Sequence, residues 1–230
     1  ALSTLDKQPV SVAGAGRTDA GVHALGQVAS FSLARDIDVD TVRRALNAHL
    51  PPSVRVVDVA VVDSRFHARF SSVSKIYRYR IWNAEVLNPF ERPYVWHIPS
   101  PRLDCAAMDD AAQQLVGTHE FSSFQSAGAT TSTAERTLYS SLVWCGEVDL
   151  SRSSAGPTSV PLLTYEVHGT GFLKHMVRSI VGTLVEVGRG RRTPASMLDV
   201  LQKRSRACAG ETAPAAGLFL VSVSYESPDL

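Results

Sequence analysis

Segments with the period of a strand and segments with the period of a helix alternate along this chain, and this alternation constrains its fold most. Strands are predicted where apolar residues form short runs or occupy every second position. The predicted strands are residues 9–14, 23–33, 54–62, 75–82, 137–150, 161–168 and 217–225, and the predicted helices are residues 40–50, 101–116, 172–187 and 194–203. This order is typical of an α+β fold with mostly antiparallel strands and helices on one face of an extended sheet.

Capping and turn residues refine these boundaries. The helix predicted at 40–50 has its apolar residues on one face, with Asp38 or Asp40 as its capping residue. Residues 1–7 are predicted to form the end of a helix. The Ser-, Gly- and Pro-rich segment 151–157 is predicted to be a turn between two strands.

The strands and helices fall into two sets, which predicts two related halves. The first half, 1–64, contains a glycine-rich loop, and the second half is 65–230. The first half has no strand before residue 9, and the chain begins with Ala1 rather than Met. We therefore expect the first half to be truncated at its N-terminus.

Composition excludes several classes of protein. The 230 residues are 44% hydrophobic and 20% charged, so the chain has enough apolar residues for a sizeable core. It contains no apolar run near the roughly 18 residues of a membrane-spanning helix. The three cysteines, Cys105, Cys145 and Cys208, are far apart, which disfavours a disulfide framework or a zinc site. A cytoplasmic protein with no membrane contact is the expectation.

The charges are segregated although the net charge is only +1. Residues 65–80 contain five basic residues and no acid, and residues 172–206 contain eight basic residues and two acids. Two solvated faces would explain such clusters. A polyanion, however, responds to the local field rather than to the total charge, so near-neutrality does not exclude a nucleic-acid partner.

The segment Gly14–His23, with the sequence GAGRTDAGVH, is the most unusual stretch of the chain. Its glycine spacing is not that of a dinucleotide-binding loop, and a strand rather than a helix is predicted to follow it. The loop carries one acid, Asp19, two residues after Arg17. An aspartate in such a turn often serves only to form the turn, and spacing alone leaves that interpretation open.

Other reaction classes lack their motifs. The chain contains no G-x-S-x-G nucleophile turn, no phosphate-binding G-x-x-x-x-G-K-[ST] and no H-x-x-x-H pair. His175, within the apolar segment 172–187, is expected to be a hydrogen-bonded core histidine rather than a metal ligand. We expect neither a metal nor a cofactor.

Several motifs, taken in order, resemble the tRNA pseudouridine synthase A (TruA) family over almost the whole chain. They are RTDAGVH at 17–23 with GQV at 26–28, FHARF at 66–70, KIYRY at 75–79, EFSSF at 120–124, FLKHMVRSIVG at 172–182 and GLFL at 217–220. The family's opening strand and the helix after it are absent from the chain.

The resemblance implies a function and a set of site residues. It implies isomerisation of uridine to pseudouridine at positions 38, 39 and 40 of the tRNA anticodon stem-loop, without metal or cofactor, by a homodimer with tRNA across both subunits. Asp19 corresponds to the nucleophile, and the sequence leaves open whether it attacks the sugar or assists elimination to a glycal. Tyr77 corresponds to the tyrosine that stacks on the target base. Arg178 corresponds to the arginine that pairs with the aspartate, Leu218 to the aliphatic residue under the base, and Arg17 to an arginine that displaces the target nucleotide.

Each of these residues also has an ordinary structural explanation, and two other functions remain open. Tyr77 would suit a half-buried strand, Arg178 a helix surface and Leu218 a core. One alternative function is a non-catalytic tRNA-binding or folding-assistant module, motivated by the missing first strand. A weaker alternative is an enzyme that binds a small molecule at the glycine-rich loop.

Overall fold

The computed structural model describes residues 1–128, 133–149 and 159–225. The chain forms two compact units, the first of residues 1–17 and 28–72 and the second of residues 18–27 and 73–230. These units differ from the expected halves 1–64 and 65–230, because the loop that contains Asp19 is part of the second unit. The turn expected at 151–157 lies outside the described residues.

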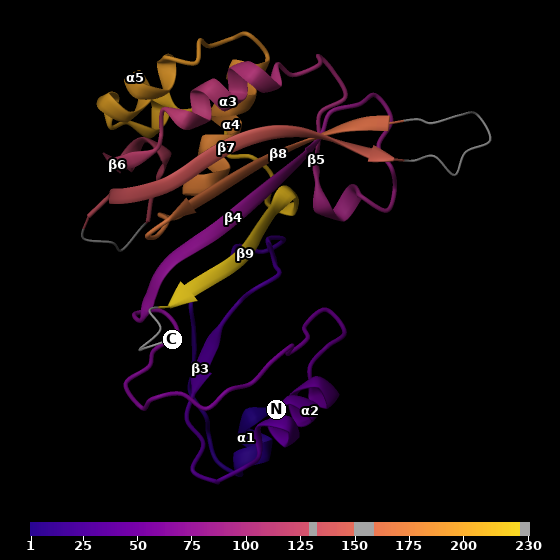
Figure 1. Ribbon diagram of the computed structural model, residues 1–230, viewed down its shortest axis with the longest axis vertical. Coiled ribbons are helices and arrows are strands. Elements are labelled where there is room, and N and C mark those ends of the chain that lie inside the picture. The colour runs from indigo at the N-terminus through magenta and orange to yellow at the C-terminus, as the bar shows by residue number, and fades with distance from the viewer. Residues whose placement is uncertain (129–132, 150–158, 226–230) are drawn as a thin grey trace, which may run out of the picture. The chain divides into compact units, whose positions relative to one another are not determined.

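The first unit contains two helices and a two-stranded sheet. Its elements are α1 (Leu2–Asp6), β1 (Val12–Gly14), β3 (Ala29–Phe31) and α2 (Val39–His49) (Figure 1). Strands β1 and β3 pair antiparallel. Asp38, one of the two residues expected to cap the helix, accepts a hydrogen bond from the Thr41 backbone N–H at 3.0 Å. The predicted helix end at 1–7 and the helix at 40–50 are thus confirmed.

The prediction of a strand at 54–62 is wrong. In the described part of the chain this segment pairs with no strand, and Val57 and Val61 are 80% and 87% exposed. The side-chain amide of Asn47 donates to the Val56 carbonyl and accepts from the Val56 N–H, both at 2.8 Å. These bonds occupy the two backbone groups of Val56 that a sheet ladder would use.

The second unit is built on a seven-stranded, mostly antiparallel sheet. Its strands are β2 (His23–Ala24), β4 (Ser72–Trp82), β5 (Trp96–His97), β6 (Gly117–Glu120), β7 (Glu135–Asp149), β8 (Ser159–Gly169) and β9 (Leu218–Tyr225). The order is β2-β9-β4-β8-β7-β6, with β5 beside β4. The α+β class is confirmed. The described strands form this sheet and the small one of the first unit, where a single extended sheet was expected.

Three helices lie on one side of this sheet: α3 (Cys105–Gln113), α4 (Met176–Gly188) and α5 (Ser196–Lys203) (Figure 1). Short 3₁₀ turns occur at Arg92–Tyr94, Ser122–Phe124, Arg206–Cys208 and Ala215–Gly217. Buried apolar residues of the three helices form one core with the inner face of the sheet. None of the described helices is long and apolar enough to cross a membrane.

Helix α4 is buried almost throughout and lies very close to the segment that follows α5. A Cβ atom at Gly182 would be 1.8 Å from the Glu211 carbonyl oxygen. The N–H of Gly210 donates to the Thr183 hydroxyl at 2.8 Å. Glycine at position 182 therefore allows the backbone of residues 210–213 to lie directly on the helix.

Candidate active site

The loop that carries Asp19 is attached to the last strand of the sheet. The Asp19 carbonyl accepts a hydrogen bond from Val22 N–H at 3.0 Å, and Gly21 has a φ of +83° that favours glycine. After this turn, β2 pairs in parallel with β9. The His23 ring also stacks on Phe219, with ring centroids 4.9 Å apart. Turn and strand together fix where the Asp19 carboxylate lies.

Arg178, on the first turn of α4, holds that carboxylate. Its Nη1 donates to Asp19 Oδ2 at 2.8 Å, and its Nε donates to the Ala213 carbonyl at 2.7 Å. The Ala213 N–H in turn donates to the Arg178 carbonyl at 3.1 Å. The Arg178 side chain is only 15% exposed, against 37% for Asp19. The guanidinium is thus fixed on two sides, while the carboxylate still reaches solvent.

Tyr77, on β4, supplies an aromatic ring beside this pair. Burial, with a smaller contribution from the negative charge of Asp19, raises the pKa of Tyr77 to about 12. The ring packs edge-on against Phe172, with centroids 5.0 Å apart. At neutral pH Tyr77 is therefore an uncharged ring within electrostatic range of the Asp19 carboxylate.

Leu218 is the first residue of β9 and is buried in the main core. It follows Gly217, where a Cβ atom would be 2.6 Å from Cζ of Tyr79. The Tyr79 hydroxyl donates to the Pro214 carbonyl at 2.7 Å. Leu218 thus occupies the core position of its ordinary structural explanation, within the cluster against which Tyr77 packs.

Arg17 is the one predicted site residue in the first unit. It is exposed to solvent. Of the five predicted residues, Asp19 and Arg178 are in direct contact in the second unit, and Tyr77 of the same unit lies within electrostatic range of Asp19. Leu218 lies in the core of that unit.

His175 was expected only as a hydrogen-bonded core residue, but its ring also contacts the Asp19 carboxylate. The prediction of a hydrogen-bonded core histidine is confirmed for the hydrogen bond, because Nδ1 is 2.8 Å from the Ser126 hydroxyl. It is wrong for the core, because the side chain is 25% exposed. The placement inside a helix is wrong, because His175 immediately precedes α4. Its Nε2 lies 3.3 Å from Asp19 Oδ2. The signal in the sequence was its spacing, three residues before Arg178, which places two side chains on one side of a helix start.

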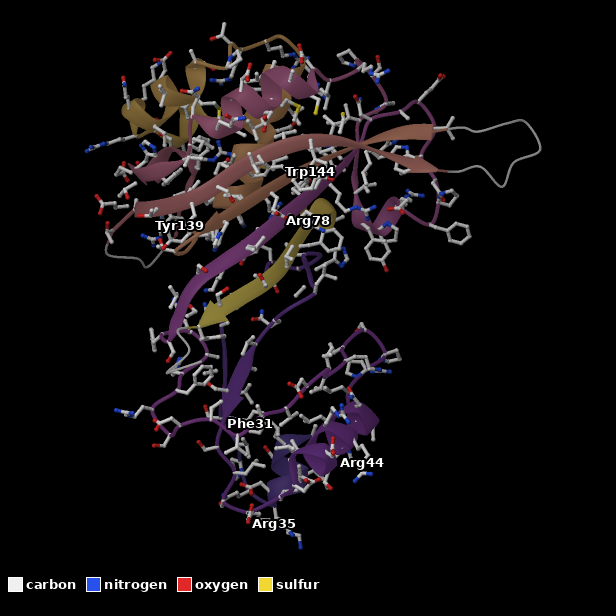
Figure 2. The ribbon with its side chains drawn as sticks, in the orientation of Figure 1. Phe31, Arg35, Arg44, Arg78, Tyr139 and Trp144 are labelled. Carbon is white, nitrogen blue, oxygen red and sulfur yellow. The ribbon has the colours of Figure 1, made fainter. Side chains whose placement is uncertain are left out.

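Acids pair with several basic residues of the two charged segments. Ion pairs join Arg65 to Asp63, Arg78 to Glu166, Arg80 to Glu91, Arg192 to Glu186 and Arg204 to Glu120. Figure 2 shows Arg78 on β4 and the exposed aromatic residues Tyr139 and Trp144 on β7. The Arg78 guanidinium carbon is 6.0 Å from the centre of the Trp144 ring. The charge available to a polyanion is therefore smaller than the sequence count suggests.

The fold and the site define a class of protein. It is an α+β protein in which an arginine-held, solvent-reaching carboxylate lies beside a neutral aromatic ring. Such a carboxylate suits nucleophilic attack or proton transfer, and such a ring suits stacking on a planar substrate.

Comparison with known proteins identifies the family. Residues 1–71 and 111–226 match the sequence profile of the tRNA pseudouridine synthase family. A tRNA pseudouridine synthase A of Solibacter usitatus is 46% identical over 224 residues, which cover 96% of this chain and 85% of that protein. Those of Brevibacillus brevis and Geobacillus kaustophilus are 44% and 43% identical, covering 98% and 94% of this chain and 86% and 79% of the relatives. This chain belongs to the tRNA pseudouridine synthase family.

Proposed function

We propose that this protein isomerises uridine to pseudouridine in tRNA, at positions 38, 39 and 40 of the anticodon stem-loop, with Asp19 as the nucleophile. The observation that carries the proposal is the 2.8 Å contact between Arg178 Nη1 and Asp19 Oδ2 beside Tyr77. Family membership supports the reaction, and the geometry supports these residues as its site.

The proposed reaction changes no atom count. The N1–C1′ glycosidic bond breaks, the uracil turns, and C5 bonds to C1′. The proton displaced from C5 is balanced by the one that N1 gains. Asp19 attacks C1′ as the N1–C1′ bond breaks, and the ester bond so formed breaks when C5 bonds to C1′. The carboxylate is thereby restored to its contact with the Arg178 guanidinium. The solvent-reaching position of Asp19 leaves room for a nucleotide to approach.

The target base must leave its helix before the carboxylate can reach C1′, at a cost of a few kcal/mol. In the proposed complex the base stacks on Tyr77, which returns about 1–3 kcal/mol. Leu218 lies under the base, and Arg17 displaces the nucleotide from the stem. Arg17 is exposed, as a phosphate-contacting arginine needs to be.

Asp19→Asn is the experiment that tests the proposal. The assay detects pseudouridine in the anticodon arm as stops of primer extension after chemical labelling. Asp40→Asn is a matched control, because Asp40 also pairs with an arginine, Arg43, at 2.8 Å but on an exposed helix. Stops should vanish for Asp19→Asn and persist for Asp40→Asn. Stops that persist in Asp19→Asn would refute the nucleophile.

The alternative is a non-catalytic tRNA-binding or folding-assistant module. It predicts salt-sensitive tRNA binding that survives Asp19→Asn, with no pseudouridine made by the wild-type chain.

We further propose that the protein is cytoplasmic and forms a homodimer with tRNA across both subunits. Light scattering would measure the mass of the dimer.

A further inference from the structure

The backbone of His175 has a conformation that its position does not explain. His175 has a φ of 62°, in the left-handed region, which residues other than glycine rarely adopt. Among the described residues, Lys7 and Arg204 share this conformation, but both end helices, where it is common. His175 instead begins a helix, where an extended conformation is usual. Strain of this kind is retained where a side chain is needed in one place.

The side chain of His175 makes no capping hydrogen bond to α4. Its ring is instead oriented by Ser126, whose hydroxyl is 2.8 Å from Nδ1. The flanking backbone reinforces this contact, because Ser126 N–H donates to the Lys174 carbonyl at 3.1 Å. Lys174 Nζ donates to the Ala127 carbonyl at 3.2 Å. The ring is therefore held from the side away from Asp19.

His175 and Arg178 both contact the same oxygen of the Asp19 carboxylate. His175 Nε2 is 3.3 Å and Arg178 Nη1 is 2.8 Å from Asp19 Oδ2. Within the described part of the chain, Oδ1 of Asp19 has no hydrogen-bond partner. One hydrogen bond, from Arg178, and one close contact, with His175, therefore fall on the same oxygen. They restrict the rotation of the carboxylate and leave the other oxygen available.

We propose that His175 is a positioning residue that acts through Asp19: with Arg178 it holds Oδ2, so that Oδ1 is the oxygen that attacks the sugar. The inference rests on the proposed function and extends it by naming the reacting atom and a second residue that orients it. The strained backbone of His175 and its bond to Ser126 place the ring for this task.

The test replaces the ring while keeping the backbone. His175→Gly adopts a φ of 62° without strain and leaves a ring-sized space next to Asp19. Because misplacement of a reacting group by about 1 Å can cost 100-fold in rate, we expect kcat on a tRNA transcript to fall roughly 10- to 100-fold, with KM changed less than about 2-fold. Added imidazole should restore part of the rate. The melting temperature should not fall, because relief of backbone strain offsets the lost Ser126 contact.

His168 offers a matched control. Its Nε2 is 2.9 Å from the Ser74 hydroxyl, the same kind of histidine–serine pair, but on β8 and without Asp19. His168→Asn should leave kcat and KM near their wild-type values. His175→Asn, which also tolerates the left-handed conformation, should lower kcat.

The outcomes separate this inference from the proposed function. A wild-type kcat in His175→Gly, a loss that appears in KM, or a loss that imidazole does not relieve overturns the role of His175 alone, provided that Asp19→Asn is inactive. Activity in Asp19→Asn overturns the nucleophile, and this inference with it. A fall in kcat with unchanged KM and rescue by imidazole supports both.

Discussion

Arg178 Nη1 donates to Asp19 Oδ2 at 2.8 Å and so joins residues 159 positions apart in the chain. The same guanidinium bonds the Ala213 carbonyl through Nε. Three segments therefore meet at one side chain: the Asp19 loop, the start of α4 and the chain before β9. The planar fork of an arginine suits this junction, because it can donate in two directions at once.

Arg178→Lys should lower the rate without unfolding the protein. A lysine keeps the charge but cannot hold both Asp19 and the Ala213 carbonyl in this geometry, so kcat should fall about 10- to 100-fold. Single-turnover rates on a tRNA transcript measure the effect. Arg43→Lys, which alters the exposed pair with Asp40, is the control and should be neutral. Equal rates in the two variants would contradict the role of Arg178.

Substitutions at Tyr77 should distinguish a stacking ring from a reacting hydroxyl. Tyr77→Phe keeps the ring and should retain most activity, whereas Tyr77→Ala removes a stacking contribution of about 1–3 kcal/mol. The alanine variant should therefore be about 5- to 150-fold slower. Rates and tRNA affinities of both variants, measured together, test this expectation. If both variants are equally active, Tyr77 is not a stacking platform.

The hydroxyl of Tyr77 should ionise at a higher pH in the folded protein than in the unfolded chain. Its pKa is raised to about 12, above the value near 10 of an unfolded chain. The resulting stabilisation is complete below pH 10 and is lost as the pH rises towards 12, because the unfolded chain then releases a proton that the folded one retains. Tyrosinate absorbance of the wild type minus that of Tyr77→Phe isolates this titration.

A second variant tests the cause of that shift. Asp19→Asn removes the negative charge that contributes to it, so the pKa of Tyr77 should fall while remaining above 10, since burial is the larger cause. An unchanged titration would mean that Asp19 and Tyr77 are not neighbours.

Gly182→Ala should be strongly destabilising although alanine favours helices. The added Cβ would lie 1.8 Å from the Glu211 carbonyl oxygen, and relieving such an overlap costs about 3 kcal/mol or more. This exceeds the gain in helix propensity of about 1 kcal/mol. Urea denaturation measures the difference. Gly146→Ala is the control, because its Cβ would be 3.8 Å from the Leu162 carbonyl oxygen, and a similar loss there would contradict the steric explanation.

Much of the second unit could be predicted from periodicity. The strands around Tyr77, β7 and β8 and the helices α3 and α5 lie where the pattern placed them, within a few residues. Helix α4 begins at Met176 rather than at residue 172, because the left-handed His175 precedes it. No hydrophobic pattern encodes that backbone conformation.

The segment 54–62 shows the opposite failure. Its valines have strand propensity, but a strand needs a neighbour with free backbone groups, and the side chain of Asn47 occupies those of Val56. The candidate site, too, could be predicted from the sequence only in part. Motifs identified Asp19, Tyr77 and Arg178, whereas the contact between His175 and Asp19 depends on how segments distant in sequence pack together.

The two-residue pairing of β2 with β9 also sets the timing of assembly during synthesis. His23 and Ala24 emerge from the ribosome long before their partners Phe219 and Leu220 are made. The loop that carries Asp19 therefore lacks its strand partner until residues 219 and 220 have been translated. A nascent chain that stops before residue 218 has Asp19 in its sequence but lacks the strand that holds its loop, so we expect activity only after β9 has been made.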